Sequence, residues 1–267
     1  MKIGAGTANR NEQIFGVLDI GTSKIAAAVV AADPGLPRTA AEPLPMRVLG
    51  LGLQRAKGLK AGVLTDLDQA EQAVRAAIAQ AEQAAGVALD SVSVSVSCGR
   101  LKSAHFAANA EVDAGVVTQA DIDRMMQGGR AYAERDGRML IHMNRLGFRL
   151  DGADGIRDPR GLAGHRLSAH LHAVTADEPP LRNLLLLIER CYLGCDGLVA
   201  TPYASALAAT TEEERALGVT CIDIGAGTTS LALFVDGVFA GADVIPVGSQ
   251  HITYDIARAL RTPISEA

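Results

Sequence analysis

Two stretches of this chain alternate apolar with small or polar residues on both sides of a small-residue turn. One covers residues 221–235, with Asp223 just before a turn at 225–229, and the other covers residues 15–30, with Asp19 in the matching place. Such alternation predicts half-buried strands, and the short glycine-containing turns predict that each stretch is a β-hairpin. Two Asp-Ile-Gly hairpins about two hundred residues apart suggest a duplicated fold.

The periodicity elsewhere predicts alternating strands and helices, which is typical of an α/β protein. Thr65-Asp-Leu-Asp68 resembles a capping box and opens a helix that ends at Gly86, and Asp177 is placed to cap another. A further helix is expected from Thr201, with Ala204, Leu207 and Ala208 facing inward. The other expected elements are strands at 47–53, 90–97, 167–175 and 238–247, helices at 179–193 and 250–260, a loop at 33–45 and a polar connector at 212–215.

Residues 98–166 differ in composition and are predicted to form a small inserted domain. They hold eleven Lys or Arg and nine Asp or Glu, with few long apolar runs. Thr118-Gln-Ala-Asp121 predicts the start of a helix, and residues 138–151 predict one or two strands. The basic residues are interpreted mainly as a solvated face, with contact to a partner as the alternative.

Composition favours a soluble protein. Of the 267 residues 48% are hydrophobic and only 3% aromatic, so Ala, Val, Leu and Ile must build the core of one or two domains. A net charge of −5 gives no reason to expect nucleic-acid binding. Residues 1–13 lack the apolar segment of a signal peptide, and apolar runs such as 25–32 are far shorter than the roughly 20 residues that span a bilayer. We therefore expect a cytoplasmic chain.

Cysteine and histidine spacing does not predict a metal centre. Cys191 and Cys195 lie one helical turn apart, but no second Cys or His pair stands at zinc-finger spacing. We interpret all four cysteines as reduced core thiols. His170 and His172 share one face of a predicted strand, yet a third ligand at motif spacing is missing.

The two turns predict phosphate binding. Glycine lets the backbone approach a ligand closely, and free N–H groups with Thr hydroxyls form a donor-rich concavity. A P-loop is excluded because no Gly-x-x-x-x-Gly-Lys-Ser/Thr stretch exists, and a dinucleotide fingerprint because residues 225–229 run into a strand rather than a helix. Asp19 and Asp223 could hold Mg²⁺ through water, and Lys24 could neutralise a phosphate oxygen.

These residues resemble a known superfamily. The hairpins are similar to the phosphate-1 and phosphate-2 motifs of the actin, heat-shock-chaperone ATPase and sugar-kinase fold. Further stretches resemble its bacterial cell-division FtsA family, among them Gly50-Leu-Gly52 and, most specifically, residues 155–167. The resemblance covers essentially the whole chain from Ile14 onward.

The resemblance implies an α/β, actin-like (ribonuclease-H-like) fold with a small α+β subdomain inserted in the first domain and an incomplete second domain. The implied divisions are residues 1–97 and 167–200 for subdomain IA, 98–166 for the inserted subdomain IC, and 201–267 for IIA with the start of IIB. Because members of the family continue further, the chain is expected to be C-terminally truncated.

The resemblance also implies a polymerising, ATP-binding protein that links the tubulin-like ring protein FtsZ to the inner membrane, on its cytoplasmic face at the division site. Other implied partners are further copies of the chain, later division proteins contacted through IC, and the membrane itself through a C-terminal helix missing after Ala267. ATP with Mg²⁺ would lie between the hairpins, the metal near Asp19 and Asp223. The implied cofactor-binding residues are Asp19, Gly21, Thr22, Ser23, Lys24, Asp223, Gly225, Ala226, Gly227, Thr228 and Thr229.

Departures from the family pattern bear on activity. Ala226 stands where the motif has a middle Gly, Ser230 where a second Asp is frequent, and Arg145-Leu146 where Pro-Gln is frequent. Loss of a carboxylate near the metal predicts a weak ATPase at most, and no catalytic residue is assigned. An actin-like adaptor of type IV pilus assembly stays open, as does a sugar or small-acid kinase, although no clear catalytic Asp is found outside the hairpins.

Overall fold

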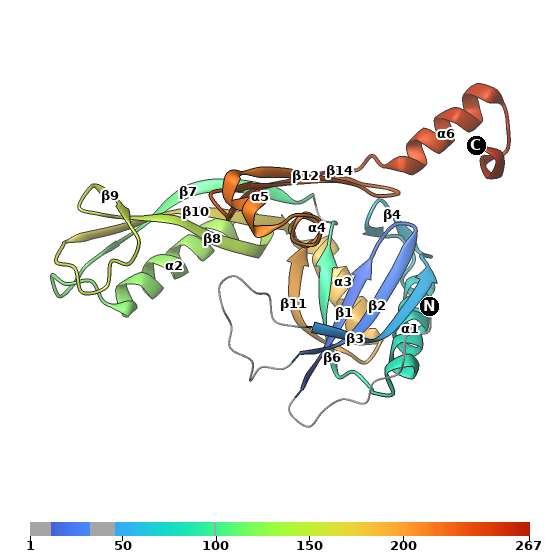
Figure 1. The fold of residues 1–267 in the computed structure, drawn as a ribbon, viewed down its shortest axis with the longest axis horizontal. Coiled ribbons are helices and arrows are strands. Elements are labelled where there is room, and N and C mark those ends of the chain that lie inside the picture. The colour runs from blue at the N-terminus through green and yellow to red at the C-terminus, as the bar shows by residue number, and fades with distance from the viewer. Residues whose placement is uncertain (1–11, 33–45, 99) are drawn as a thin grey trace.

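The computed structural model describes residues 12–32, 46–98 and 100–267 (Figure 1). The loop predicted at 33–45 and residues 1–11 of the polar N-terminal stretch lie outside the described residues. Two larger sheets organise the rest, one of five strands and one of seven. No helix in the described part of the chain is both long and apolar enough to cross a membrane.

The first hairpin lies within the five-stranded sheet. The elements of this half are β1 (Gln13–Ile20), β2 (Lys24–Ala32), β3 (Met46–Arg55), the short pair β4 (Leu59–Lys60) and β5 (Val63–Leu64), α1 (Leu67–Ala85), β6 (Ser91–Val96), α3 (Glu178–Arg190) and β11 (Gly194–Ala200). The sheet order is β11-β6-β1-β2-β3. β1, β2 and β3 pair antiparallel as a meander, whereas β6 and β11 join in parallel, which requires crossover connections.

Glycines let α1 lie directly on the backbone of β3. A Cβ at Gly52 would stand 1.8 Å from the Ala77 carbonyl oxygen, and one at Gly50 would stand 2.1 Å from that of Ala81. The side of α1 that faces the sheet is itself small. Its buried residues are Ala70, Ala73, Val74, Ala77, Ile78 and Ala81. Close packing of the backbones of α1 and β3 therefore compensates for the scarcity of large aromatic side chains.

Two predicted helix caps differ from the structure. The N-cap of α1 is Asp66 rather than Thr65, and the Asp66 side chain accepts a hydrogen bond from the Gln69 amide at 3.0 Å. Asp177 stands at the N-cap position of α3 but makes no capping bond. Its carboxylate instead forms a 2.6 Å ion pair with Arg138, so the charge serves to hold β8 rather than the helix.

The second hairpin and the inserted domain share the seven-stranded sheet. Its strands in spatial order are β12 (Val219–Ile224), β13 (Thr229–Val235), β14 (Val238–Ile245), β7 (Lys102–Glu111), β10 (Arg166–Asp177), β8 (Arg138–Leu150) and β9 (Ala153–Ile156). Among the described residues a single pair, Asp243 with Lys102, joins β14 to β7. The inserted domain therefore extends from the hairpin as an arm, seen at the left of Figure 1.

The inserted domain has its own small core beneath α2 (Gln119–Ala133). The predicted capping box is confirmed, because Thr118 and Asp121 bond each other's backbone amides. β10 belongs to both cores, since Leu171 lies in the small one and Val174 in the main one. One continuous strand thus connects the arm to the main core. The domain boundary at residue 166 stays a prediction.

Three helices complete the described chain. They are α4 (Thr201–Ala209), α5 (Glu212–Leu217) and α6 (Ser249–Leu260), followed by a 3-10 turn at Ile264–Glu266. The polar connector predicted after α4 is helical, because a capping box between Thr211 and Glu214 starts α5 there. The predicted inward face of α4 is also wrong, since Leu207 and Ala208 are exposed and Ala206 is buried instead.

His172 lies fully buried near the junction of the arm and the second hairpin. Its Nδ1 is 3.0 Å from the Phe239 carbonyl oxygen, and its Nε2 is 2.6 Å from Ser103 Oγ. Burial, and after it the neighbouring His105 ring, lower the pKa of His172 to about 4. A neutral ring thus bonds β10 to β7 and β14, whereas His170 on the same strand is exposed.

Replacing Gly52 by Ala is expected to destabilise the chain, because the new Cβ would push α1 away from β3. We expect the free energy of unfolding to fall by about 1–3 kcal/mol, which is usual for overpacking. Denaturant titration followed by circular dichroism measures the loss. Gly147→Ala is the matched control, since no heavy atom lies within 4 Å of a Cβ there. Equal stability of the two variants would refute the close-packing argument.

Stability is expected to fall as the pH drops from about 6.5 to about 4. The folded-state pKa of His172 is depressed, so the unfolded chain takes up the proton first and is favoured across this window. His172→Gln keeps a donor and an acceptor without the titration. It should reduce the pH-dependent loss by roughly 1–3 kcal/mol, since one pKa unit is worth about 1.4 kcal/mol. His170→Gln, at an exposed position of the same strand, serves as the control. The assignment would be contradicted if His172→Gln kept the pH dependence of the unchanged chain.

Candidate functional site

A cavity of about 440 Å³ lies between the turns of the two hairpins. Both hairpins contribute to it although they belong to different sheets. Nine of the eleven residues predicted to bind the cofactor line it. They are Asp19, Gly21, Thr22, Ser23, Lys24, Asp223, Gly225, Ala226 and Thr228.

The other two predicted residues lie beside the cavity. Gly227 is buried against the first hairpin, where a Cβ would stand 2.6 Å from Thr22 Oγ1. The Thr229 hydroxyl donates to the Val247 carbonyl at 2.7 Å and so is bonded to the segment that follows β14. Gly227 therefore sets how closely the two turns approach, and Thr229 fixes the chain that leads into α6.

The two turns are closed by the same backbone hydrogen bond. The Gly21 amide donates to the Lys24 carbonyl at 3.0 Å, and the Gly225 amide donates to the Thr228 carbonyl at 2.9 Å. Each turn thus places its Asp two residues before the bonded glycine. This repeated geometry is what the duplicated Asp-Ile-Gly pattern predicts.

A serine from a neighbouring element holds each carboxylate. Ser95 on β6 donates to Asp19 Oδ1, and Ser205 on α4 donates to Asp223 Oδ2 at 2.7 Å. Each bond engages one oxygen of its carboxylate and fixes the orientation of the side chain. The sequence analysis missed both serines. Ser95 could have been found once β6 was placed in parallel beside β1, because that register sets Ser95 opposite Asp19.

Two helices begin at the cavity. Thr201 and Ser249, the first residues of α4 and α6, line its wall together with Ser97 and Ser230. The first amides of α6 are bonded to the second turn, since the Ser249 amide donates to the Gly225 carbonyl at 2.9 Å. Helix N-termini carry partial positive charge, so both helices favour an anion here.

The donor set fits a magnesium-bound phosphate chain. Two carboxylates face one cavity with hydroxyls and turn amides around them, and Lys24 supplies a cation at its exposed edge. Mg²⁺ is commonly held by one or two carboxylates, substrate phosphates and water. Asp19 and Asp223 are the residues that would hold it. In the described chain no cluster of three or more His, Cys, Asp or Glu side chains is placed to bind a metal.

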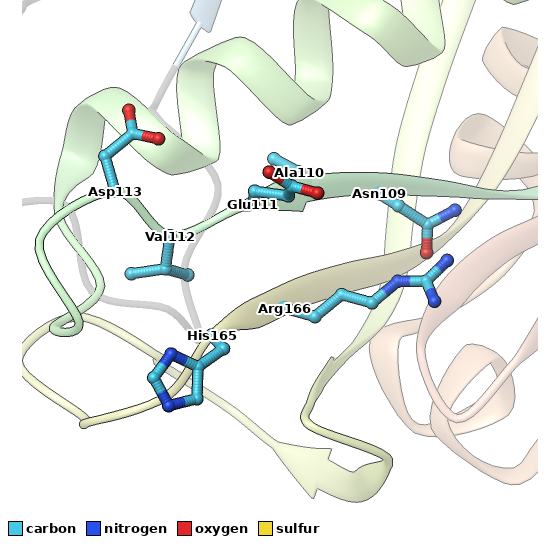
Figure 2. A pocket seen from close by; sticks show the side chains of 7 residues that line it. All are labelled: Asn109, Ala110, Glu111, Val112, Asp113, His165 and Arg166. Carbon is cyan, nitrogen blue, oxygen red and sulfur yellow. The ribbon is translucent and has the colours of Figure 1, made fainter.

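A larger hollow of about 640 Å³ lies on the arm and contains none of the predicted site residues. Figure 2 shows its lining from the ends of β7 and β10, with acidic Glu111 and Asp113 on one side and His165 and Arg166 on the other. Asp113 is already paired with Arg124 at 2.8 Å. The hollow is open and of mixed charge, so we place the candidate site between the hairpins.

Comparisons with known proteins bear on both halves of the chain. Residues 98–175 match the domain described as the SHS2 domain inserted in FTSA, and residues 220–267 match the family Cell division protein FtsA. Cell division protein FtsA of Rhizobium meliloti is 38% identical over 264 residues, which cover 97% of this chain and 59% of that protein. The protein of the same name from Escherichia coli K12 is 32% identical over 253 residues, covering 94% and 58%. The chain thus spans about three fifths of these relatives.

Solved structures show the same fold at low identity. A chain of the PilM-PilN type IV pilus biogenesis complex superposes with a TM-score of 0.66 at 17% identity, covering 94% of this chain and 67% of that one. Ethanolamine utilization protein EutJ from Carboxydothermus hydrogenoformans gives 0.50 at 17% identity, covering 95% and 59%. At such identity these likenesses concern the fold alone.

The predicted actin-like fold with an inserted domain is confirmed by these structural neighbours and by the match over the arm. Two family matches and relatives of 32–38% identity that cover nearly all of this sequence agree with the motifs found in both hairpins. The chain belongs to the FtsA family of actin-like cell-division proteins.

Proposed function

We propose that this chain forms the ATP-binding cleft of a cell-division protein that links the FtsZ ring to the inner face of the cell membrane. The observation that carries the proposal is the pair of serine-held carboxylates, Asp19 and Asp223, lining one cavity between two equivalent turns. This arrangement provides oxygen ligands for Mg²⁺ from both sides of a phosphate chain.

In this proposal each group has a separate task. Turn amides other than those of Gly21 and Gly225, together with the hydroxyls of Thr22 and Thr228, donate to phosphate oxygens. Lys24 neutralises negative charge. Asp19 and Asp223 would hold Mg²⁺, whose charge would offset the negative charge of the phosphate chain. Ser230, buried at the cavity wall where the family often has Asp, offers a hydroxyl rather than a base. We therefore infer nucleotide binding with slow hydrolysis at most.

The partners follow from family membership and from the shape of the chain. The arm, predicted as residues 98–166, stands apart with its own core and offers surface to neighbouring copies or to later division proteins. FtsZ and the inner membrane are the other partners that we propose. The protein would then be peripheral on the cytoplasmic face at the division site.

The pilus adaptor stays the alternative, since a chain of the PilM-PilN complex shares this fold. That likeness has 17% identity, whereas the division proteins reach 38%. Co-purification of the protein from its own host decides between them. Recovery of FtsZ supports the division role, and recovery of a pilus membrane protein without FtsZ contradicts it.

Asp223→Asn is expected to weaken Mg²⁺-dependent ATP binding about tenfold or more, because an interaction with a charged group is worth roughly 1.5–3 kcal/mol. Isothermal titration with MgATP, and again with ATP and EDTA, measures the effect. The variant should differ from the unchanged chain only when Mg²⁺ is present. Asp236→Asn, in the β13–β14 turn of the same sheet, is the control. No detectable ATP binding by the unchanged chain would contradict the proposal.

Gly227→Ala is expected to weaken ATP binding with or without Mg²⁺, because its methyl group would force the turns apart at Thr22. A loss of threefold to tenfold, about 0.7–1.4 kcal/mol, is expected in the same titrations. Adding Thr22→Ser removes Cγ2, one of the two nearest atoms, keeps the hydroxyl and should restore part of the affinity. Gly197→Ala, where a Cβ meets open space, is the control. Unchanged affinity in Gly227→Ala would show that turn spacing does not limit binding.

A further inference from the structure

α4 connects the cavity to the second hairpin. It lies where the two sheets meet (Figure 1), and it contributes two side chains to the site. Thr201 lines the cavity, and Ser205 one turn later holds the Asp223 carboxylate at 2.7 Å. A shift of this short helix would therefore move a cavity wall and a candidate magnesium ligand together.

The start of α4 is held by a side chain from the arm. The amide of Ala200, the N-cap residue, donates to Nε2 of His142 on β8 at 2.9 Å. β11 ends at this residue and is the edge strand of its sheet, so β6 pairs with it on one side only. His142 accepts the bond that no neighbouring strand offers on the other side.

The same imidazole also packs on the first turn of α4. The His142 ring lies 4.9 Å from the Tyr203 ring and 6.0 Å from that of Phe239, centre to centre. Tyr203 in turn lies 4.8 Å from Phe239 and 6.0 Å from Phe234. The helix is thus held by one hydrogen bond at its start and by an aromatic cluster along one side.

The bond requires an imidazole whose Nε2 carries no proton. Burial lowers the pKa of His142, which keeps the ring neutral. In the neutral ring Nδ1 then carries the hydrogen and Nε2 is free to accept. The geometry and the environment of His142 therefore agree with an acceptor role.

We propose that His142 is a positioning residue through which the inserted arm holds α4, and with it Asp223, in place for the phosphate site. The contacts run from β8 through His142 to the Ala200 amide, along α4 to Ser205, and from Ser205 to Asp223. The effect on nucleotide rests on the proposed function, whereas the effect on α4 does not. By linkage, nucleotide bound at Asp223 would in turn stabilise the contact between arm and helix.

Hydrogen–deuterium exchange of the chain without nucleotide tests the contact directly. His142→Ala should speed exchange of the amides in residues 200–205 roughly threefold to tenfold, which corresponds to the loss of one hydrogen bond. His142→Gln places an amide oxygen near the position of Nε2 and should restore most of the protection. His170→Ala, at an exposed histidine on β10, is the matched control.

MgATP titrations of the same variants test the consequence for the site. His142→Ala should raise the dissociation constant about threefold to tenfold, with recovery in His142→Gln. Unchanged exchange in residues 200–205 of His142→Ala overturns the proposal, as does faster exchange with unchanged MgATP affinity. Absence of MgATP binding in the unchanged chain overturns the proposed function instead, and exchange alone then decides the role of His142.

Discussion

The contact between Thr22 and Gly227 fixes the geometry on which the candidate site depends. The two turns belong to different sheets, and Gly227 leaves no room for even one more carbon atom against the Thr22 side chain. Close-packed contacts of this kind resist both approach and separation. The distance between the two turns is thereby set by van der Waals contact, and the cavity is the space left beside that contact.

The same use of small residues recurs away from the site. Gly50 and Gly52 bring β3 against the backbone of α1, and the buried face of that helix is mostly alanine. A chain with 3% aromatic residues cannot fill wide gaps between its layers. It stabilises the fold through close backbone approach instead, which gives the first hairpin a stiff support. Three aromatic rings, Tyr203, Phe234 and Phe239, meet at the junction with the arm.

The sequence allowed a large part of this architecture to be predicted, because its strongest signals are local. The two hairpins and the capping box at Thr118 depend on neighbouring residues alone. The contacts that the sequence analysis missed join residues that are far apart in the chain. Asp177 was predicted to cap α3, but its carboxylate is paired with Arg138. Ser95 and Ser205 carried no signal, because only the strand order and the position of α4 bring them to the carboxylates.

These two serines also make the halves of the site physically different. Ser95 lies on β6, a central strand whose neighbours β1 and β11 hold it on both sides. Ser205 lies on a nine-residue helix whose start depends on a side chain of the arm. Short helices gain most of their stability from packing rather than from their own hydrogen bonds. Asp19 is thus fixed by a sheet, whereas the position of Asp223 depends on how the arm meets the second hairpin. Any movement of the arm would therefore displace Asp223 before it displaces Asp19.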